Sequence, residues 1–348
     1  MSEPGAGGGG SEAAVTREGL EGARPGREAK TWSGDGDNRR RGGRQDHPGS
    51  SYYGNSIIKP PVWEELEIAG YLFAGGLAGA SSIVAAGADL SGRPAMARAS
   101  RLAATAAVTA SLGALVKDLG RPLRFLNMLR VFKPTSPMSV GVWILAGYAP
   151  LAAASAAADV LGRAPRAGRL AGIGAGLLGA GVASYTAALI SNTSVPAWHE
   201  GRREMPFLFV GSAASAGAGF ALLAAPQGEN EPALRLALLG ATTELIGEQL
   251  MERRLGDLAE PLRGGRAGRR LKLAKALTAA GAIGAATVGR RSRLAAALSG
   301  AALLTGSALT RFGIFAAGME SARDPKYTVD PQRRRLAGED GAGADGSG

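Results

Sequence analysis

Residues 68–88 read IAGYLFAGGLAGASSIVAAGA, and this stretch decides the fold class. Its 21 residues carry no charge, and Asp89 ends the run. The hydrocarbon core of a bilayer is about 30 Å thick, so about 20 consecutive apolar residues suffice for one helix to cross it. Because backbone N–H and C=O groups in lipid must pair within the segment, the run predicts a transmembrane helix.

Seven further apolar runs follow the first one. They lie at residues 102–116, 138–158, 170–199, 205–227, 236–250, 271–289 and 294–310, and the last resumes beyond Arg311. The shorter runs need basic residues that reach the interface from their ends, or a polar face turned inward. The sequence therefore predicts an all-α integral membrane protein with eight transmembrane helices, whose even spacing is compatible with two four-helix bundles.

The two ends of the chain differ in composition from this membrane core. Residues 1–50 and 328–348 are rich in Gly, Ser, Glu and Arg and hold almost no large apolar side chain. Such segments cannot bury enough apolar surface to offset the entropy lost on ordering. We therefore predict disordered polar tails at 1–50 and 328–348 around a transmembrane domain at 51–327. The mean hydropathy of +0.03 averages these two kinds of segment.

The composition excludes several kinds of chemistry. The chain has no Cys and two His residues, His47 and His199. It therefore cannot form a disulfide, hold an iron–sulfur cluster or covalent haem through thiolates, or build a haem site with two axial histidines inside the membrane. No phosphate-binding Gly loop, nucleophile triad or metal-ligand cluster is present. The net charge of +11 is spread over the loops, which disfavours nucleic-acid binding.

Small residues recur at one-turn spacing in several of the runs. In lipid, helices associate through close backbone approach, so such stripes predict helix-packing seams, with room for a flat ligand as the alternative. The stripes are Gly75 and Gly79, Gly172 and Gly176, and Gly211 with Ser215 and Gly219.

The segment after the second run, residues 117–139, interleaves basic and apolar side chains. One interpretation is a short helix on the membrane surface, in contact with lipid headgroups. The other is a docking surface for a partner subunit, in which an Asp among several basic residues forms a structural ion pair. The candidate docking residues are Asp118, Arg121, Arg124, Arg130 and Lys133.

Several longer motifs carry a family resemblance. They are YYG at 52–54, PPVW at 60–63, YLFAGGLAG at 71–79, DLGRP at 118–122, RFLNMLR at 124–130, PTSPMS at 134–139 and MESARDP at 319–325. Over residues 51–327, and most clearly over 52–143, the chain resembles the NrfD/PsrC family. These are the membrane subunits of polysulfide reductase, nitrite reductase and related molybdoenzyme complexes.

The resemblance implies a haem-free, eight-helix, quinone-binding membrane anchor. Such a subunit exchanges electrons between the menaquinone pool and a four-cluster ferredoxin-like iron–sulfur subunit, which connects to a molybdopterin catalytic subunit. The iron–sulfur clusters and the molybdenum cofactor then belong to partners, and the expected location is the cytoplasmic membrane of a prokaryote. The loops on the side of the termini hold more Lys and Arg than the opposite loops, which favours termini in the cytoplasm.

The resemblance also places the quinone near the start of the first helix and the end of the fourth. Tyr185 matches a family tyrosine there, whereas Tyr71 and Ile68 stand where the polysulfide reductase subunit has His and Asn. A tyrosine can donate a hydrogen bond to a quinone oxygen without bringing charge into lipid. We expect Tyr185, Tyr71, Trp63 and His199 at the quinone. The alternatives are core tyrosines, interface aromatics and a solvated loop histidine.

Two acidic residues, Glu244 and Glu248, lie one helical turn apart in an apolar run. Ionised carboxylates facing lipid are costly, so this face should point inward, with Arg311 as a counter-ion. It is either a proton path that couples quinone chemistry to charge movement or an inward ion-pair network.

Two other classes of protein compete with the quinone-linked anchor. A multi-helix transporter explains the helices and intramembrane acids, but it predicts paired interrupted helices, which the sequence lacks. A purely structural membrane anchor without a quinone site explains the docking loop equally well.

Overall fold

The computed structural model describes residues 15–16, 19–20, 58, 61, 63–118 and 127–331. The chain divides between Asn55 and Ser56 into two units. In the first unit, β1 (Val15–Thr16) and β2 (Gly19–Leu20) pair antiparallel. The remainder of the predicted tail at 1–50, and residues 332–348, lie outside the described residues, so their disorder stays a prediction.

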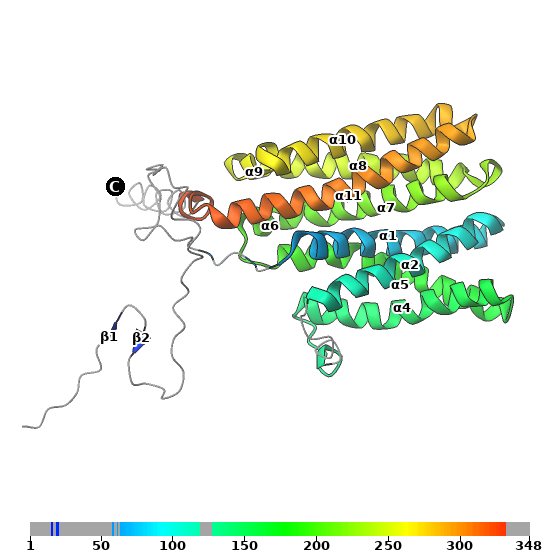
Figure 1. Ribbon diagram of the computed structural model, residues 1–348, viewed down its shortest axis with the longest axis horizontal. Helices are drawn as coiled ribbons and strands as arrows, with labels where there is room; N and C mark the ends of the chain where they lie inside the picture. The colour runs from blue at the N-terminus through cyan, green and yellow to red at the C-terminus, as the bar shows by residue number, and fades with distance from the viewer. Residues whose placement is uncertain are drawn as a thin grey trace, which may run out of the picture. The chain divides into compact units, whose positions relative to one another are not determined.

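The second unit is built from long helices (Figure 1). They are α1 (Glu65–Leu90), α2 (Pro94–Asp118), α4 (Pro137–Leu161), α5 (Pro165–Ser191), α7 (Met205–Ala224), α8 (Glu231–Leu255), α10 (Gly265–Ala286) and α11 (Arg293–Arg323). Short helices connect them: α6 (Pro196–Glu200), η2 (Gly201–Arg203), η3 (Gln227–Glu229), η4 (Gly256–Ala259), α9 (Glu260–Arg263) and η5 (Val288–Arg290).

Six of the described helices are long and apolar enough to cross a membrane, namely α1, α2, α4, α5, α7 and α11. The chain is therefore a multi-pass helical membrane protein. Helices α8 and α10 are long enough, but their charged residues keep them out of this group. The prediction of eight transmembrane helices is thus not confirmed for these two.

The long helices pack as two groups of four. In one group α1 contacts α2 and α5, and α4 contacts α5 and α2; in the other, α7 contacts α8 and α11, and α10 contacts α11 and α8. The groups meet where α1 lies along α7 and α11 and where α5 lies along α7 (Figure 1).

Glycines make the close approaches between these helices. A Cβ added to Gly179 on α5 would lie 2.6 Å from the carbonyl oxygen of Gly79 on α1. A Cβ on Gly219 of α7 would lie 2.6 Å from the carbonyl oxygen of Gly300 on α11. Backbone atoms cannot move aside as a side chain can, so only glycine fits. The predicted packing seams at Gly79 and Gly219 are confirmed.

The run at 170–199 does not form one continuous helix. Helix α5 ends at Ser191, and Pro196 begins the separate α6. Proline lacks the N–H that continues a helix but fits its first turn, which explains the break. His199 therefore lies on α6 rather than at the end of the fourth long helix, which corrects the placement expected from the sequence.

Helix α2 begins at Pro94, earlier than the apolar run at 102–116 suggests. The additional turns hold Arg101, which is buried and forms ion pairs with Asp89 on α1 and Asp159 on α4. An arginine neutralised in this way is compatible with a spanning helix.

Candidate functional site

An apolar cavity of about 700 Å³, including its open mouth, lies at one end of the first helix group. Its walls come from α1, α2, α4 and α5, together with the residue before α1 and the loop after α2. The lining residues are Trp63, Ile68, Tyr71, Leu72, Leu115, Asp118, Met128, Met138, Val142, Leu145, Tyr185, Leu189 and Ile190.

Helical spacing explains why these side chains face one cavity. Residues three or four positions apart lie on the same face of a helix. Ile68, Tyr71 and Leu72 follow this spacing on α1, and Tyr185 and Leu189 follow it on α5. The cavity is therefore bordered by one apolar stripe from each helix, with the tyrosines as the main polar interruption.

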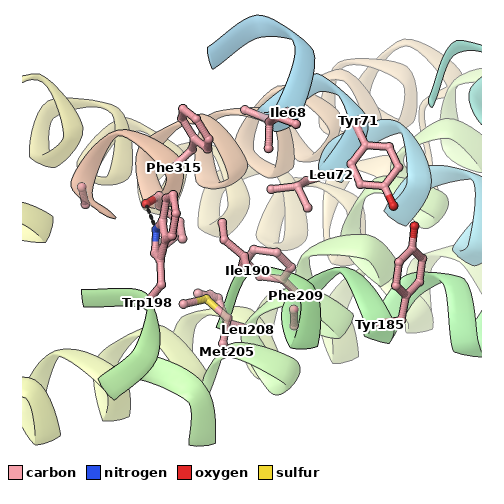
Figure 2. Close-up of a cluster of buried hydrophobic side chains, with 14 of the residues drawn as sticks. Ile68, Tyr71, Leu72, Tyr185, Ile190, Trp198, Met205, Leu208, Phe209 and Phe315 are labelled. Carbon is pink, nitrogen blue, oxygen red and sulfur yellow. Dashed lines mark hydrogen bonds between the residues drawn. The ribbon is translucent and has the colours of Figure 1, made fainter. Parts of the chain in front are cut away.

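Tyr71 and Tyr185 direct their hydroxyl groups toward one another (Figure 2). Both side chains are buried, and the Tyr185 hydroxyl has no hydrogen-bond partner among the described residues. Gly141 on α4 packs against the Tyr185 ring, where a Cβ would overlap the ring, so the ring is fixed in place. An unpaired buried hydroxyl costs free energy unless a ligand or water satisfies it.

Trp63 connects the cavity to the second helix group. Its ring stacks on Trp198 of α6, with the ring centroids 6.0 Å apart. The Trp198 indole N–H donates to the Ile314 carbonyl of α11 at 2.9 Å, and its ring packs against Phe315 (Figure 2). This aromatic stack holds the segment before α1 in place.

His199, the fourth residue expected at the quinone, does not line this cavity. It is exposed on α6 and borders a different cavity with Glu200, Leu258 and Tyr327. The structure therefore brings Trp63, Tyr71 and Tyr185 together and separates His199 from them. The sequence did not predict the position of His199, because it did not show that α5 ends at Ser191 and that a separate helix begins at Pro196.

Asp118 at the end of α2 and Met128 in the loop that follows both line the cavity. Arg130 and Lys133 are exposed, whereas Arg121 and Arg124 lie outside the described residues. The loop is fastened to α4, because the Trp143 indole N–H donates to the Val131 carbonyl at 3.3 Å. Its described basic side chains thus face outward beside the cavity. Met128 was missed by sequence reasoning, which singled out only the charged residues.

A second set of polar residues is buried among α7, α8 and α11. Glu244 and Glu248 on α8 are almost fully buried, as the sequence predicted for this face. One Glu244 carboxylate oxygen accepts a hydrogen bond from Thr310 at 2.7 Å, and the other has no hydrogen-bond partner within the described part of the chain.

Arg311 is also fully buried, but it forms no ion pair in the described part of the chain. It donates to the Phe209 carbonyl at 2.7 Å and lies over the Phe209 ring at 3.8 Å. Its Nε and Nη1 atoms have no hydrogen-bond partner among the residues that the structure describes. Arg311 therefore makes no direct ion pair with Glu244 among the described residues, but the two charges lie close enough to interact electrostatically, as expected of a counter-ion.

Lys275 on α10 connects the buried acids to the surface. Its ammonium group lies 3.5 Å from Glu248 and 2.6 Å from Glu252, and the lysine is about one-third exposed. Glu244, Glu248 and Glu252 thus form a ladder of carboxylates at one-turn spacing along α8. The sequence analysis did not single out Lys275, because helical spacing on α8 alone does not show which residue of another helix faces Glu248.

The fold and the cavity define a multi-pass helical membrane protein with an apolar, tyrosine-containing site near one end of its helices. Residues 55–231, which are 177 of the 348, match the family described as "Polysulphide reductase, NrfD". The chain belongs to this family. No curated protein matches it.

Family membership and the apolar helices make the chain a membrane subunit of a polysulfide- or nitrite-reductase type complex. Members of the family are generally paired with other redox subunits. The match covers every residue that lines the apolar cavity, whereas most of α8 and all of α10 and α11 follow its end.

Proposed function

We propose that this chain is the quinone-interacting anchor of a molybdopterin oxidoreductase complex. It exchanges electrons between the menaquinone pool and a partner iron–sulfur subunit, and the molybdenum cofactor belongs to a catalytic subunit. The apolar cavity with the unpaired Tyr185 hydroxyl carries this proposal. The family match makes a redox complex the natural setting.

The residues around the cavity fit a quinone. A quinone is flat and apolar apart from its carbonyl oxygens, and small-molecule sites are mostly apolar with a few placed polar groups. Here the walls are aliphatic and aromatic, and Tyr185 and Tyr71 supply the hydroxyl groups. The quinone, when bound, supplies the two-electron chemistry. Tyr185 donates a hydrogen bond to one of its oxygens, and the apolar walls orient the ring and exclude water.

The loop after α2 is proposed to dock the iron–sulfur subunit. Asp118 at the end of α2 and Met128 of the loop line the cavity, while Arg130 and Lys133 of the loop are exposed. A partner with an acidic surface that binds these basic side chains would lie next to the cavity. The same surface is where electrons would enter or leave.

We propose that α8 and α10 also cross the membrane, which gives eight spans. Their outward faces are apolar, since Leu239 and Ile246 on α8 and Leu273 and Ile283 on α10 are exposed large hydrophobic residues. On α8, Glu244 and Glu248 face inward instead, so these two charges do not contact lipid.

The carboxylate ladder on α8 is proposed to carry protons. Glu252 and Lys275 lie at the accessible end, and Glu248 and Glu244 follow deeper inside. The unpaired oxygen of Glu244 and the unpaired nitrogens of Arg311 are polar atoms that water molecules could bridge. Such a path would couple quinone chemistry to charge movement.

The proposed location is the cytoplasmic membrane of a prokaryote with both termini in the cytoplasm. A phosphatase reporter fused to the C-terminus tests the orientation. An inactive phosphatase is expected, and an active one would place the termini on the outer side.

Turnover of the purified complex with a menaquinone analogue tests the function. The anchor with a quinone site should transfer electrons between the analogue and the partner subunits. A complex that assembles normally, transfers electrons internally and never reacts with the analogue would identify a purely structural anchor.

A further inference from the structure

A second cavity opens at the opposite end of the helices, between the two groups. It holds about 850 Å³ including its open part, and its walls come from the end of α1, the start of α2 and the start of α8. The lining residues are Ile83, Val84, Gly87, Ala88, Ser91, Arg93, Met96, Glu231, Pro232, Ala233, Arg235 and Leu236. None of them borders the tyrosine cavity.

This groove has an apolar inner part and a charged mouth. Ile83, Val84 and Leu236 form the inner wall, and Arg93, Glu231 and Arg235 surround the mouth. Ile83 lies seven residues before the end of α1, so the groove extends about 10 Å into the membrane at 1.5 Å per residue. That depth reaches from the headgroup level to the first part of the acyl chains.

The charge at the mouth is positive and partly uncompensated. Arg235 forms an exposed ion pair with Glu231 at 3.1 Å, which contributes little because solvent screens it. Arg93 donates to the Ser91 carbonyl at 3.2 Å, and its guanidinium has no carboxylate partner among the described residues. The lining holds two guanidinium groups and one carboxylate, and the nearby Glu229 carboxylate is engaged by backbone N–H groups of α2, so an anion is favoured at the arginines. Guanidinium binds phosphate through paired hydrogen bonds.

Hydrogen bonds join the two helix groups beside the groove. The Glu229 carboxylate, just before α8, accepts hydrogen bonds from the backbone N–H groups of Ala95 at 3.3 Å and Met96 at 2.7 Å. This carboxylate satisfies the N-terminus of α2. A further anion at the mouth would therefore bind the arginines.

We propose that this groove binds one phospholipid with an anionic headgroup. Its phosphate pairs with Arg93 and Arg235, and an acyl chain lies along Ile83, Val84 and Leu236. Because α1 and α8 belong to different helix groups, the lipid joins the two groups at this end. The site is independent of the quinone function.

The charge and the apolar wall together select this occupant. A soluble phosphate would use the arginines but leave the apolar wall exposed. A zwitterionic lipid would fill the wall, but its own cation would oppose binding at the positive mouth.

The test uses the full-length chain purified in detergent and titrated with phosphatidylglycerol or phosphatidylcholine of identical acyl chains. Native mass spectrometry counts retained lipids, and the thermal transition reports stabilisation. We expect at least tenfold tighter retention of phosphatidylglycerol. The variant R93Q/R235Q should lose this difference. The control R290Q/R291Q removes two exposed arginines at the same end of the helices and should keep it.

A second variant probes the apolar wall without altering the charge. Gly87 lines the groove and has no atom within 4 Å of an added Cβ, so Gly87→Phe should fill the groove while the protein still folds. We expect it to displace the lipid. Equal retention of the two lipids by the wild type, an undiminished preference for phosphatidylglycerol in R93Q/R235Q, or retention of phosphatidylglycerol by a folded Gly87→Phe protein would overturn the proposal.

Discussion

Tyr71 of α1 and Tyr185 of α5 direct their hydroxyl groups toward one another at the edge of an apolar cavity, and the Tyr185 hydroxyl is buried without a partner (Figure 2). Two helices of one packed group thus present polar atoms to the same space. A buried hydroxyl left unpaired is unfavourable unless something in the cavity accepts its hydrogen bond. This relationship is the observation that supports the proposed quinone site.

Replacing Tyr185 by Phe should weaken quinone binding while the protein stays stable. The hydroxyl has no partner to lose among the described residues, so folding should be unaffected or slightly improved. The loss of one hydrogen bond to the quinone costs about 1 kcal/mol, which is about fivefold in KM for a menaquinone analogue. Steady-state turnover of the complex measures the change.

Tyr148→Phe is the matched control for that variant. The Tyr148 hydroxyl is buried and lies 2.8 Å from the Ser82 hydroxyl, and the residue does not line the cavity. We expect a stability loss of about 1 kcal/mol and an unchanged KM. If Tyr148→Phe alters KM and Tyr185→Phe does not, the quinone does not bind in this cavity.

Gly141→Ala should disturb the site through the Tyr185 ring. An added Cβ would overlap that ring, whereas a Cβ on Gly181 of α5 would make an ordinary 3.4 Å contact with Ile144. We expect Gly141→Ala to raise the KM for the menaquinone analogue and Gly181→Ala to leave it unchanged. Equal kinetics for both variants would show that the ring position does not matter.

Many of the helices could be predicted from runs of uncharged residues, because a helix that crosses the hydrocarbon core of a bilayer must be largely apolar. Residues 68–88 lie within α1, and the run beyond Arg311 continues through α11. The interruption at Pro196 and the early start of α2 were not predicted. The first depends on a local break within an apolar stretch, and the second on the neutralisation of Arg101 by acids on two other helices.

The site was predictable only in part. Tyr71 and Tyr185 followed from the family resemblance, and helical spacing alone could not show that their side chains meet. Met128 and Val142 enter the cavity wall through packing between distant segments, which no local pattern reveals. Lys275 lies in the predicted run at 271–289, but no local pattern shows that its ammonium group lies beside Glu248 of α8.

Gly79→Ala should destabilise the first helix group. The new methyl group would meet the backbone of Gly179, which cannot yield without separating α1 from α5. Overpacking of this kind costs about 1–3 kcal/mol. In Gly113→Ala on α2 the methyl group meets open space, so stability should hold or rise slightly. Thermal unfolding in detergent compares the two variants. Equal midpoints would contradict the close contact between α1 and α5 at Gly79 and Gly179.

Glu244→Gln should reduce proton movement without abolishing electron transfer. Gln keeps the shape of the side chain and can still accept from Thr310, but it cannot bind and release a proton. We expect slower proton uptake by proteoliposomes containing the complex during quinol turnover. Unchanged proton uptake with normal turnover would remove the carboxylate ladder from the mechanism.

The ion pair between Glu204 and Arg254 should make stability depend on pH in the acid range. The Arg254 guanidinium, at 2.5 Å, lowers the pKa of Glu204 below its usual value near 4.5. A lowered folded-state pKa adds stability above the unfolded pKa, and this stability is lost as the pH falls through the folded value. The wild type should therefore exceed Glu204→Gln in Tm at neutral pH, and the difference should shrink in acid. A pH-independent difference would contradict this assignment.

Photoaffinity labelling of the purified complex with an azido-quinone tests the central claim most directly. We predict label on peptides from α1 and α5 that contain Tyr71 and Tyr185, competed away by excess menaquinone and reduced in Tyr185→Phe. Competed label confined to other helices, or no competed label on this chain in a complex that reacts with quinone, would contradict the cavity as the quinone site.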